Sequence, residues 1–155
     1  MLGKLNPAWL WAGAALLGLF VFSADAAPAA QSATVEELKA RLTSAGGGDR
    51  VQLCIQIAER QLEAVDKFYL TDETEKARTA LDDVASFAEQ ARDSSIQFHK
   101  RQKQTEIAVR KMVRKLFDIK RAVSHEEQVP VEAAIDRLQR VRDDLLAAMF
   151  PKERK

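Results

Sequence analysis

Apolar residues recur at steps of three and four along most of this chain, and no glycine or proline interrupts residues 49–129. Such spacing aligns apolar side chains on one face of a helix and, when sustained, is typical of coiled-coil-like packing. A single register runs from Ala77 through Leu116 to Val123. We therefore predict an all-α fold, an antiparallel helical bundle of three to five helices with one very long, continuous or bent, central helix.

The middle of this long helix is its weakest part. Its core positions hold Ser95, Gln102 and Thr105, and the polar residues 93–95 are suited to cap a new helix. The absence of glycine and proline favours a continuous or bent helix. A clean break near residue 94 is the alternative.

The remaining helices are predicted from capping residues and from the seams, by which we mean the lines of apolar residues at steps of three and four along one helix face. Capping boxes occur at three places, each pairing a capping residue with a Glu or Gln three positions later: Thr34 with Glu37, Asp49 with Gln52, and Asp72 with Glu75. They predict helices over residues 34–43 and 51–69 and the start of the long helix. Pro130 suits the first turn of a last helix, after a polar loop over residues 124–129. Short connections imply that the second helix packs on the first half of the long helix and the last helix on its second half.

Residues 1–26 have the pattern of a secretory signal peptide. Lys4 is followed by an uncharged stretch over residues 5–24, and Ala24-Asp25-Ala26 forms an A-x-A cleavage site. We expect export to the periplasm or the medium. The alternative is an inner-membrane anchor that is not cleaved, because the uncharged stretch is near the minimum length of a membrane span.

The rest of the chain divides simply. Residues 27–33 form a flexible linker, residues 34–150 one helical bundle domain, and residues 151–155 a charged tail.

The net charge of the whole chain is +1. A dedicated nucleic-acid binder usually carries a strong basic excess, so we expect no nucleic-acid partner.

Cys54 is the only cysteine, so the chain has no internal disulfide. It lies beside the seam residues Val51 and Ile55, which predicts a buried, small apolar side chain. A disulfide between two chains remains the alternative in an oxidising compartment.

The sequence carries no recognisable catalytic motif. The run from His125 to Glu127 lacks a second histidine at helical spacing, and the glycines at 46–48 lack the Lys-Ser or Lys-Thr of a phosphate-binding loop. Glu59, Glu63 and Asp66 share a helix face as in a di-iron bundle, but the Glu-x-x-His motifs are missing. We therefore expect no enzyme activity, no cofactor and no metal site, and we interpret these carboxylates as a solvated face.

Positive charge is concentrated in residues 100–121, which hold nine Lys or Arg and two acidic residues. Phe117 and Ile107, off the main seam, would strengthen membrane or polymer binding if they are exposed. The simpler interpretation is a solvated face that pairs with acidic residues of the last helix, namely Asp136, Asp143 and Asp144. The candidate anionic docking face consists of Lys100, Lys103, Arg110, Lys111, Arg114, Lys115 and Arg121.

Two resemblances accompany these patterns. The hairpin over residues 51–89 has an aromatic residue, Phe68 or Tyr69, before its turn and Ala77, Leu81 and Val84 after it. It resembles a single tetratricopeptide-type helix pair, without that motif's glycine turn or Trp-Leu-Gly start. In size, helicity and predicted export the chain is similar to small periplasmic helical chaperones, but it lacks their Leu-Thr-x-x-Gln signature. It looks like an exported helical bacterial protein, and neither resemblance supplies functional residues.

The function these features favour is a non-enzymatic structural or adaptor role in the cell envelope. Its partners would be envelope proteins or a second copy of the chain, bound through helix faces. The alternative is a peripheral binder of anionic lipid or cell-wall polymer through the basic segment 100–121.

Overall fold

A computed structural model describes residues 33–151 of the protein. This part of the chain contains five helices and no β-strand, which confirms the predicted all-α class. The predicted signal peptide, residues 27–32 of the linker and residues 152–155 of the tail lie outside the described residues. The helices are α1 (Val35–Leu42), α2 (Gly47–Leu70), α3 (Thr74–Phe98), α4 (Gln102–Ala122) and α5 (His125–Met149).

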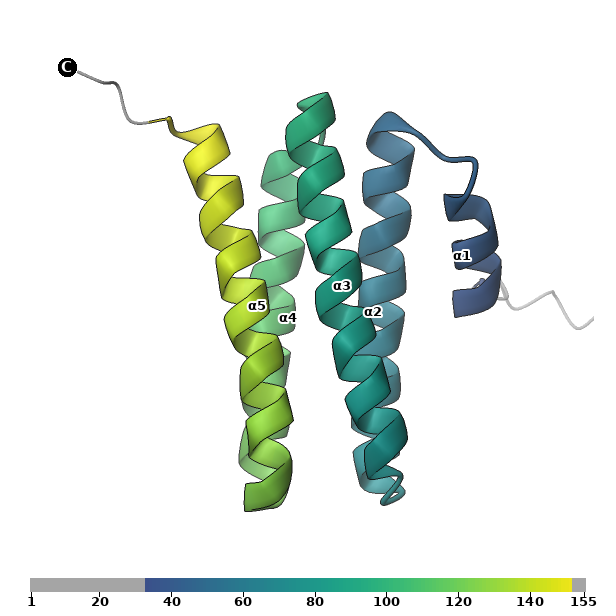
Figure 1. Ribbon diagram of the computed structural model, residues 1–155, viewed down its shortest axis with the longest axis vertical. Helices are drawn as coiled ribbons and strands as arrows, with labels where there is room; N and C mark the ends of the chain where they lie inside the picture. Colours follow the sequence, from purple (N-terminus) through teal and green to yellow (C-terminus); the bar gives the residue numbers. More distant parts are fainter. Residues whose placement is uncertain (1–32, 152–155) are drawn as a thin grey trace, which may run out of the picture. The chain divides into compact units, whose positions relative to one another are not determined.

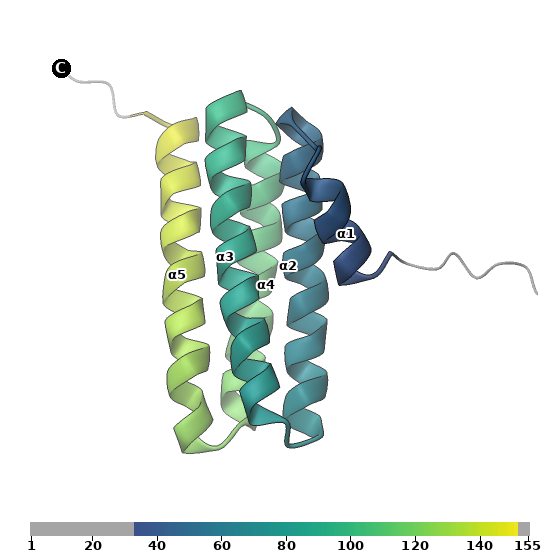
Figure 2. The same ribbon diagram turned by 45° about the vertical axis from the view of Figure 1, so that its right-hand side comes forward.

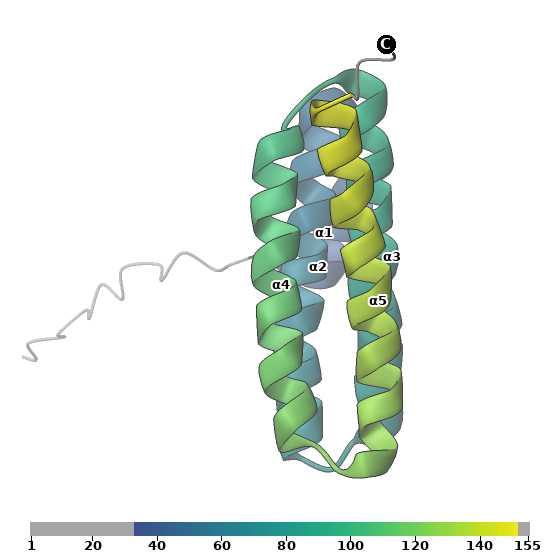
Figure 3. The same cartoon turned by 90° about the vertical axis from the view of Figure 1, so that its left-hand side faces the viewer.

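Helices α2 to α5 form an antiparallel bundle in which each helix reverses the direction of the one before it (Figure 1). The pairs α2–α3 and α4–α5 pack closely, as predicted from the short connections. Helix α3 also packs along α5, whereas α2 and α4 touch least of all the packed pairs. Figure 3 shows α4 and α5 side by side, with α2 behind α4.

The bundle core is built from the predicted seam. Val65 of α2, Val84 of α3, Leu116 of α4 and Leu138 of α5 are all fully buried and belong to one apolar cluster. Burying an aliphatic side chain of this size stabilises a fold by about 1.5–3 kcal/mol. Ala148, predicted on the same seam, is exposed near the end of α5.

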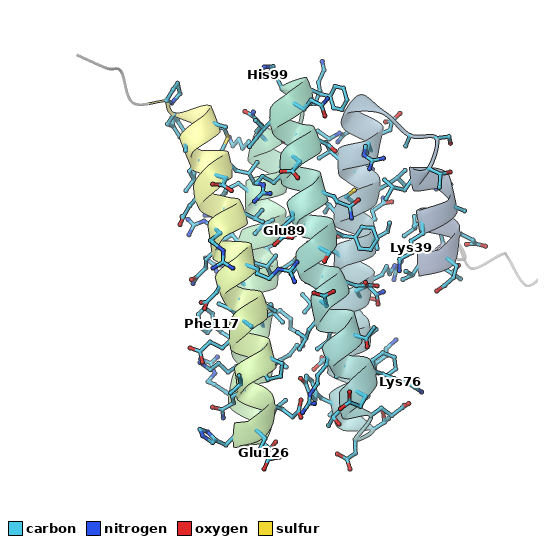
Figure 4. The ribbon with its side chains drawn as sticks, in the orientation of Figure 1. Lys39, Lys76, Glu89, His99, Phe117 and Glu126 are labelled. Atoms are coloured by element: carbon cyan, nitrogen blue, oxygen red, sulfur yellow. The ribbon has the colours of Figure 1, made fainter. Side chains whose placement is uncertain are left out.

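Helix α1 lies against α2 and covers a second, smaller cluster (Figure 2). Its two leucines, Leu38 and Leu42, are buried there. Lys39 links α1 to α3, because its Nζ lies 3.0 Å from Oδ2 of Asp83 and 5.3 Å from the centroid of the Phe87 ring (Figure 4 labels Lys39). An eight-residue helix is too short to be stable alone in water, so these contacts hold it in place.

The predicted long helix is divided in two, which corrects both its length and the expected position of a break. Helix α3 ends at Phe98 and α4 begins at Gln102. His99 and Arg101 adopt left-handed backbone conformations, with φ of 51° and 57°. The turn folds the second half of the seam back onto the bundle, where its apolar side chains leave water. The hydrophobic register passes unbroken through this turn, so it did not reveal the reversal.

Two polar core positions support the turn between α3 and α4. Ser95 is fully buried and its hydroxyl donates to the carbonyl oxygen of Lys100 at 2.7 Å. Thr105 is 1% exposed and its hydroxyl donates to the carbonyl oxygen of Arg101 at 2.9 Å. Buried polar groups need hydrogen-bond partners. These two hydroxyls donate to carbonyl oxygens of the turn, which an apolar side chain at the same position could not do.

Only the first of the three predicted capping boxes is present. The Thr34 amide donates to Oε2 of Glu37 at 2.8 Å, and the Glu37 amide donates to Oγ1 of Thr34 at 3.2 Å. The box predicted at Asp49 is wrong, because α2 begins at Gly47 with Gly46 as its N-cap. Glycine tolerates the N-cap position well, so α2 starts three residues earlier than a helix capped by Asp49 would.

The third box is also wrong. Asp72 adopts a left-handed conformation with φ of 59°, and Glu73 is the N-cap of α3 without a side-chain cap. Asp and Asn tolerate the left-handed conformation in tight turns. Asp72 therefore forms part of the turn before α3 instead of capping that helix.

The loop predicted over residues 124–129 is helical. Helix α5 begins at His125, and the carbonyl oxygen of Ser124 accepts bonds from the amides of Glu127 and Gln128 at 3.0 and 3.1 Å. Pro130 therefore lies inside the helix instead of in its first turn. Proline lacks an amide hydrogen, so this position lacks one helical hydrogen bond.

Candidate docking surface on α4

Four of the predicted basic residues share one exposed face of α4. Lys103, Arg110, Arg114 and Arg121 follow one another at steps of seven, four and seven, which a helix of 3.6 residues per turn places on the same side. All four are exposed. Between them lie half-buried Ile107 and exposed Phe117. We call these six residues the outer face of α4.

Phe117 gives this face an apolar centre. Its side chain is 41% exposed, between Arg114 and Arg121 on the helix surface. Figure 4 places Phe117 at the edge of the molecule, between the levels of Glu126 and His99. An exposed aromatic ring flanked by cations combines apolar contact area with charge, which is typical of recognition surfaces.

The other three predicted residues lie elsewhere. Lys100 is in the turn between α3 and α4, and Lys111 and Lys115 lie on the side of α4 that faces α2. The candidate surface therefore has two parts on α4, and a single seven-residue face does not exist. The heptad spacing could not distinguish the lysines that face α2 from the cations of the outer face, because spacing does not tell which neighbouring helix each side of α4 contacts.

The ion pairs of this segment leave several cations free. Lys115 Nζ lies 2.6 Å from Oδ2 of Asp66 in α2, and Arg121 pairs with Asp118 one turn earlier. Arg110 is 3.8 Å from Glu106, at the edge of contact. Within residues 33–151, no ion pair involves Lys100, Lys103, Lys111 or Arg114.

The expected pairing of this segment with Asp136, Asp143 and Asp144 is not what the structure shows. Asp144 pairs instead with Arg92 of α3, at 2.9 Å. The connections between α4 and α5 involve other residues. Lys120 lies 3.1 Å from Glu132, and Arg142 donates to Glu106 at 2.7 Å. Among the described residues, no ion pair joins the outer face of α4 to Asp136, Asp143 or Asp144.

Glu106 fixes how α4 faces α5, and the sequence analysis did not identify this role. The residue is 7% exposed, and its Oε1 accepts from Nε of Arg142 at 2.7 Å. A buried carboxylate is tolerated only when a cation and hydrogen bonds accompany it. This contact orients α4 so that Arg110, four residues later, points outward.

A second buried carboxylate, that of Glu127, lies in the run from His125 to Glu127 that the sequence analysis considered for a metal. Glu127 accepts from Nη2 of Arg78 at 2.6 Å and from the hydroxyl of Tyr69 at 3.2 Å. The hydrogen bond from Arg78 holds the pKa of Glu127 below its usual value, and burial with the nearby carboxylate raises the pKa of Tyr69 to about 12. Within residues 33–151, no group of three or more potential ligands could hold a metal ion.

A groove opens between α2 and α4, beside the outer face. Its volume is about 500 Å³. The floor is apolar and consists of Leu62, Ala108 and Met112. Partial loss of hydration raises the pKa of Glu59, on the α2 wall, above its usual value, although much of its side chain stays in contact with water. The walls are formed by Glu59, Glu63, Asp66 and Lys67 from α2 and by Lys111 and Lys115 from α4.

The acidic trio interpreted as a solvated face therefore lines this groove. Glu59 and Glu63 are exposed and Asp66 is half-buried, so water reaches all three.

Cys54 is far more enclosed: its side chain is fully buried under α1, as predicted for a small apolar core residue. Burial raises the pKa of its thiol to about 11.

Known proteins supply no further guide to the site. No protein-family model matches the sequence, and neither the curated proteins nor the solved structures contain a significant match. Among the helices that the structure describes, none combines the length and the hydropathy needed to cross a membrane.

Proposed function

We propose that this protein is a non-enzymatic adaptor that binds an acidic segment of a partner protein through the outer face of α4. The observation that carries the proposal is the row of exposed cations that share one face of α4 with Phe117. Lys103 and Arg114 make no ion pair with any described residue, so they are available to a ligand. Interfaces are enriched in arginine and aromatic residues, and charge complementarity selects the partner.

The fold supports this role because it presents the face on a rigid element. Helix α4 is held by the hydrogen bond between buried Glu106 and half-exposed Arg142 and by the core residues Met112 and Leu116. A preorganised helix loses little conformational entropy when it binds. The expected location, the cell envelope, comes only from the signal-peptide pattern of residues 1–26.

A direct test uses a fluorescently labelled acidic peptide that contains one leucine or phenylalanine per helical turn, titrated with the protein. The variant Lys103→Gln with Arg114→Gln removes two free cations and leaves the ion pairs of Arg110 and Arg121 intact. The matched control is Arg41→Gln with Arg140→Gln, which removes two exposed charges elsewhere. We expect the first variant to weaken binding by about tenfold or more and the control to change it less than about twofold.

Binding that both variants weaken equally would show only non-specific attraction and would contradict the proposal.

The second candidate function, binding of anionic lipid or cell-wall polymer, is favoured by the exposed ring of Phe117 beside cations. Co-sedimentation with anionic and neutral vesicles distinguishes it. Sedimentation with anionic vesicles alone, lost on Phe117→Ser and at higher salt, would favour the lipid surface over the acidic peptide.

A further inference from the structure

The side of the bundle between α2 and α4 differs from the other three. Like α3 and α5, these two helices run in the same direction, but they touch least among the packed pairs, and the groove of about 500 Å³ lies between them. This volume falls within the range of ligand-binding clefts. The floor residues Leu62, Ala108 and Met112 are at most 9% exposed, so they are reached only by a side chain that enters between the helices.

One ion pair spans the groove. Lys115 and Asp66 approach to 2.6 Å, and it is the only ion pair between α2 and α4 in residues 33–151. Both side chains are more than 40% exposed. An exposed pair of this kind rarely contributes much to stability, so a ligand can displace it at little cost.

The two walls carry opposite net charge, because Glu59, Glu63 and Asp66 outnumber Lys67 on the α2 wall, whereas the charged residues of the α4 wall are Lys111 and Lys115. Glu59 and Glu63 extend from α2, and Lys111 extends from α4 without an ion pair in the described part of the chain. A ligand with charge of one sign is attracted by one wall and repelled by the other. A ligand with an apolar ridge between a basic flank and an acidic flank satisfies the floor and both walls together.

We propose that this groove binds an amphipathic helix of a partner protein. Its leucine- or methionine-sized ridge lies over Ala108 and Met112, its basic flank faces Glu59, and its acidic flank faces Lys111. Helices bind other proteins in this way through apolar residues spaced three and four apart. The unbranched side chain of Met112 adapts readily to such a ridge. The site is on the flank of α4 toward α2, so it does not depend on the outer face.

The test uses synthetic helical peptides of about 18 residues with a leucine ridge. The first has one lysine flank and one glutamate flank, the second has lysine on both flanks, and the third has glutamate on both. Binding is followed through the methyl signal of Met112 in protein labelled at its methionine methyl groups. Met149, near the end of α5, serves as the internal reference.

Two pairs of variants locate the site. Ala108→Phe fills the groove, and Ala147→Phe adds the same ring to an exposed position of α5. Lys111→Glu reverses the basic wall without breaking an ion pair among the described residues, and Lys103→Glu makes the same change on the outer face. If Ala108→Phe fails to fold, the pair of lysine variants still decides the outcome.

The proposal predicts a saturable shift of the Met112 signal, with Met149 unmoved. It predicts tightest binding for the peptide with mixed flanks, and a loss of about tenfold or more in Ala108→Phe and Lys111→Glu but not in their controls. Equal binding of all three peptides, equal effects of the two lysine variants, or no shift at Met112 would overturn it. Lys103→Gln with Arg114→Gln should leave this binding unchanged, so failure of the outer-face proposal is recognised separately.

Discussion

Arg137 of α5 donates two parallel hydrogen bonds to Glu89 of α3, Nε to Oε1 and Nη2 to Oε2, both of 2.8 Å. The same guanidinium donates to Asp82 at 2.7 Å and to the hydroxyl of Ser86 at 3.1 Å. Bidentate geometry with additional acceptors makes this a strong ion pair between the two helices. It fixes the register of α3 against α5, two helices that run in the same direction without a direct connection.

Replacing Arg137 should therefore destabilise the bundle more than replacing a nearby free arginine. We expect Arg137→Ala to lower the free energy of unfolding by about 1–2 kcal/mol, because it leaves Glu89 without its main partner. Arg140→Ala, three residues later on an exposed position, should change it by less than about 0.5 kcal/mol. Urea unfolding of both variants measures the difference, and equal effects would show that the contact is not formed.

The same contact should make stability depend on pH. The hydrogen bond from Arg137 lowers the pKa of Glu89 below 4.5 in the folded protein. A lowered folded-state pKa contributes stability above the unfolded-state pKa, and this contribution is lost as the pH falls through the folded value. The gap in unfolding free energy between the native protein and Arg137→Ala should therefore be full at neutral pH and shrink below about pH 4. A gap that widens on acidification would contradict this assignment.

Glu106 and Arg142 should behave as a coupled pair. Arg142→Ala leaves a carboxylate that is only 7% exposed without its close partner, so we expect a loss of about 1–3 kcal/mol. Glu106→Leu with Arg142→Ala removes both charges and should recover a large part of that loss. A double-mutant cycle from urea unfolding gives the coupling energy, and additive effects would mean that the two side chains do not interact.

Cys54 should be inert while the protein is folded. Its side chain is fully buried, and burial raises the pKa of its thiol to about 11, so thiolate is scarce at neutral pH. Labelling with a maleimide should be slow in buffer and rapid in denaturing urea. Fast labelling under native conditions would contradict this burial, and a dimer that a reducing agent separates would support the disulfide between chains that the sequence left open.

The periodic residues predicted most of the fold. Val65, Val84, Leu116 and Leu138 are buried where the steps of three and four place them, and the two hairpins follow from the short connections. The break at residues 99–101 was missed because neither glycine nor proline marks it. His99 and Arg101 take left-handed conformations that residues other than glycine adopt infrequently, and burial of the apolar side chains of α4 compensates.

The candidate site could be predicted only in part. The sequence identified the cations of α4, but it could not tell that Lys111 and Lys115 face α2 while Arg114 faces outward. That division depends on the positions of α2 and α5 around α4. Buried Glu106 carried no signal either, because an acidic residue at a flanking helical position is usually solvated.

The central claim is that the outer face of α4 binds a partner protein, and site-specific photo-crosslinking in the cell that makes this protein tests it most directly. Phe117 is replaced by a photoreactive benzoylphenylalanine, which keeps an aromatic ring between Arg114 and Arg121. Phe150, which is 71% exposed against 41% for Phe117, receives the same group as the control. We predict a discrete protein adduct from position 117 that Lys103→Gln with Arg114→Gln abolishes, and no such adduct from position 150. Absence of a protein adduct at position 117, or the same adducts from both positions, would contradict the account.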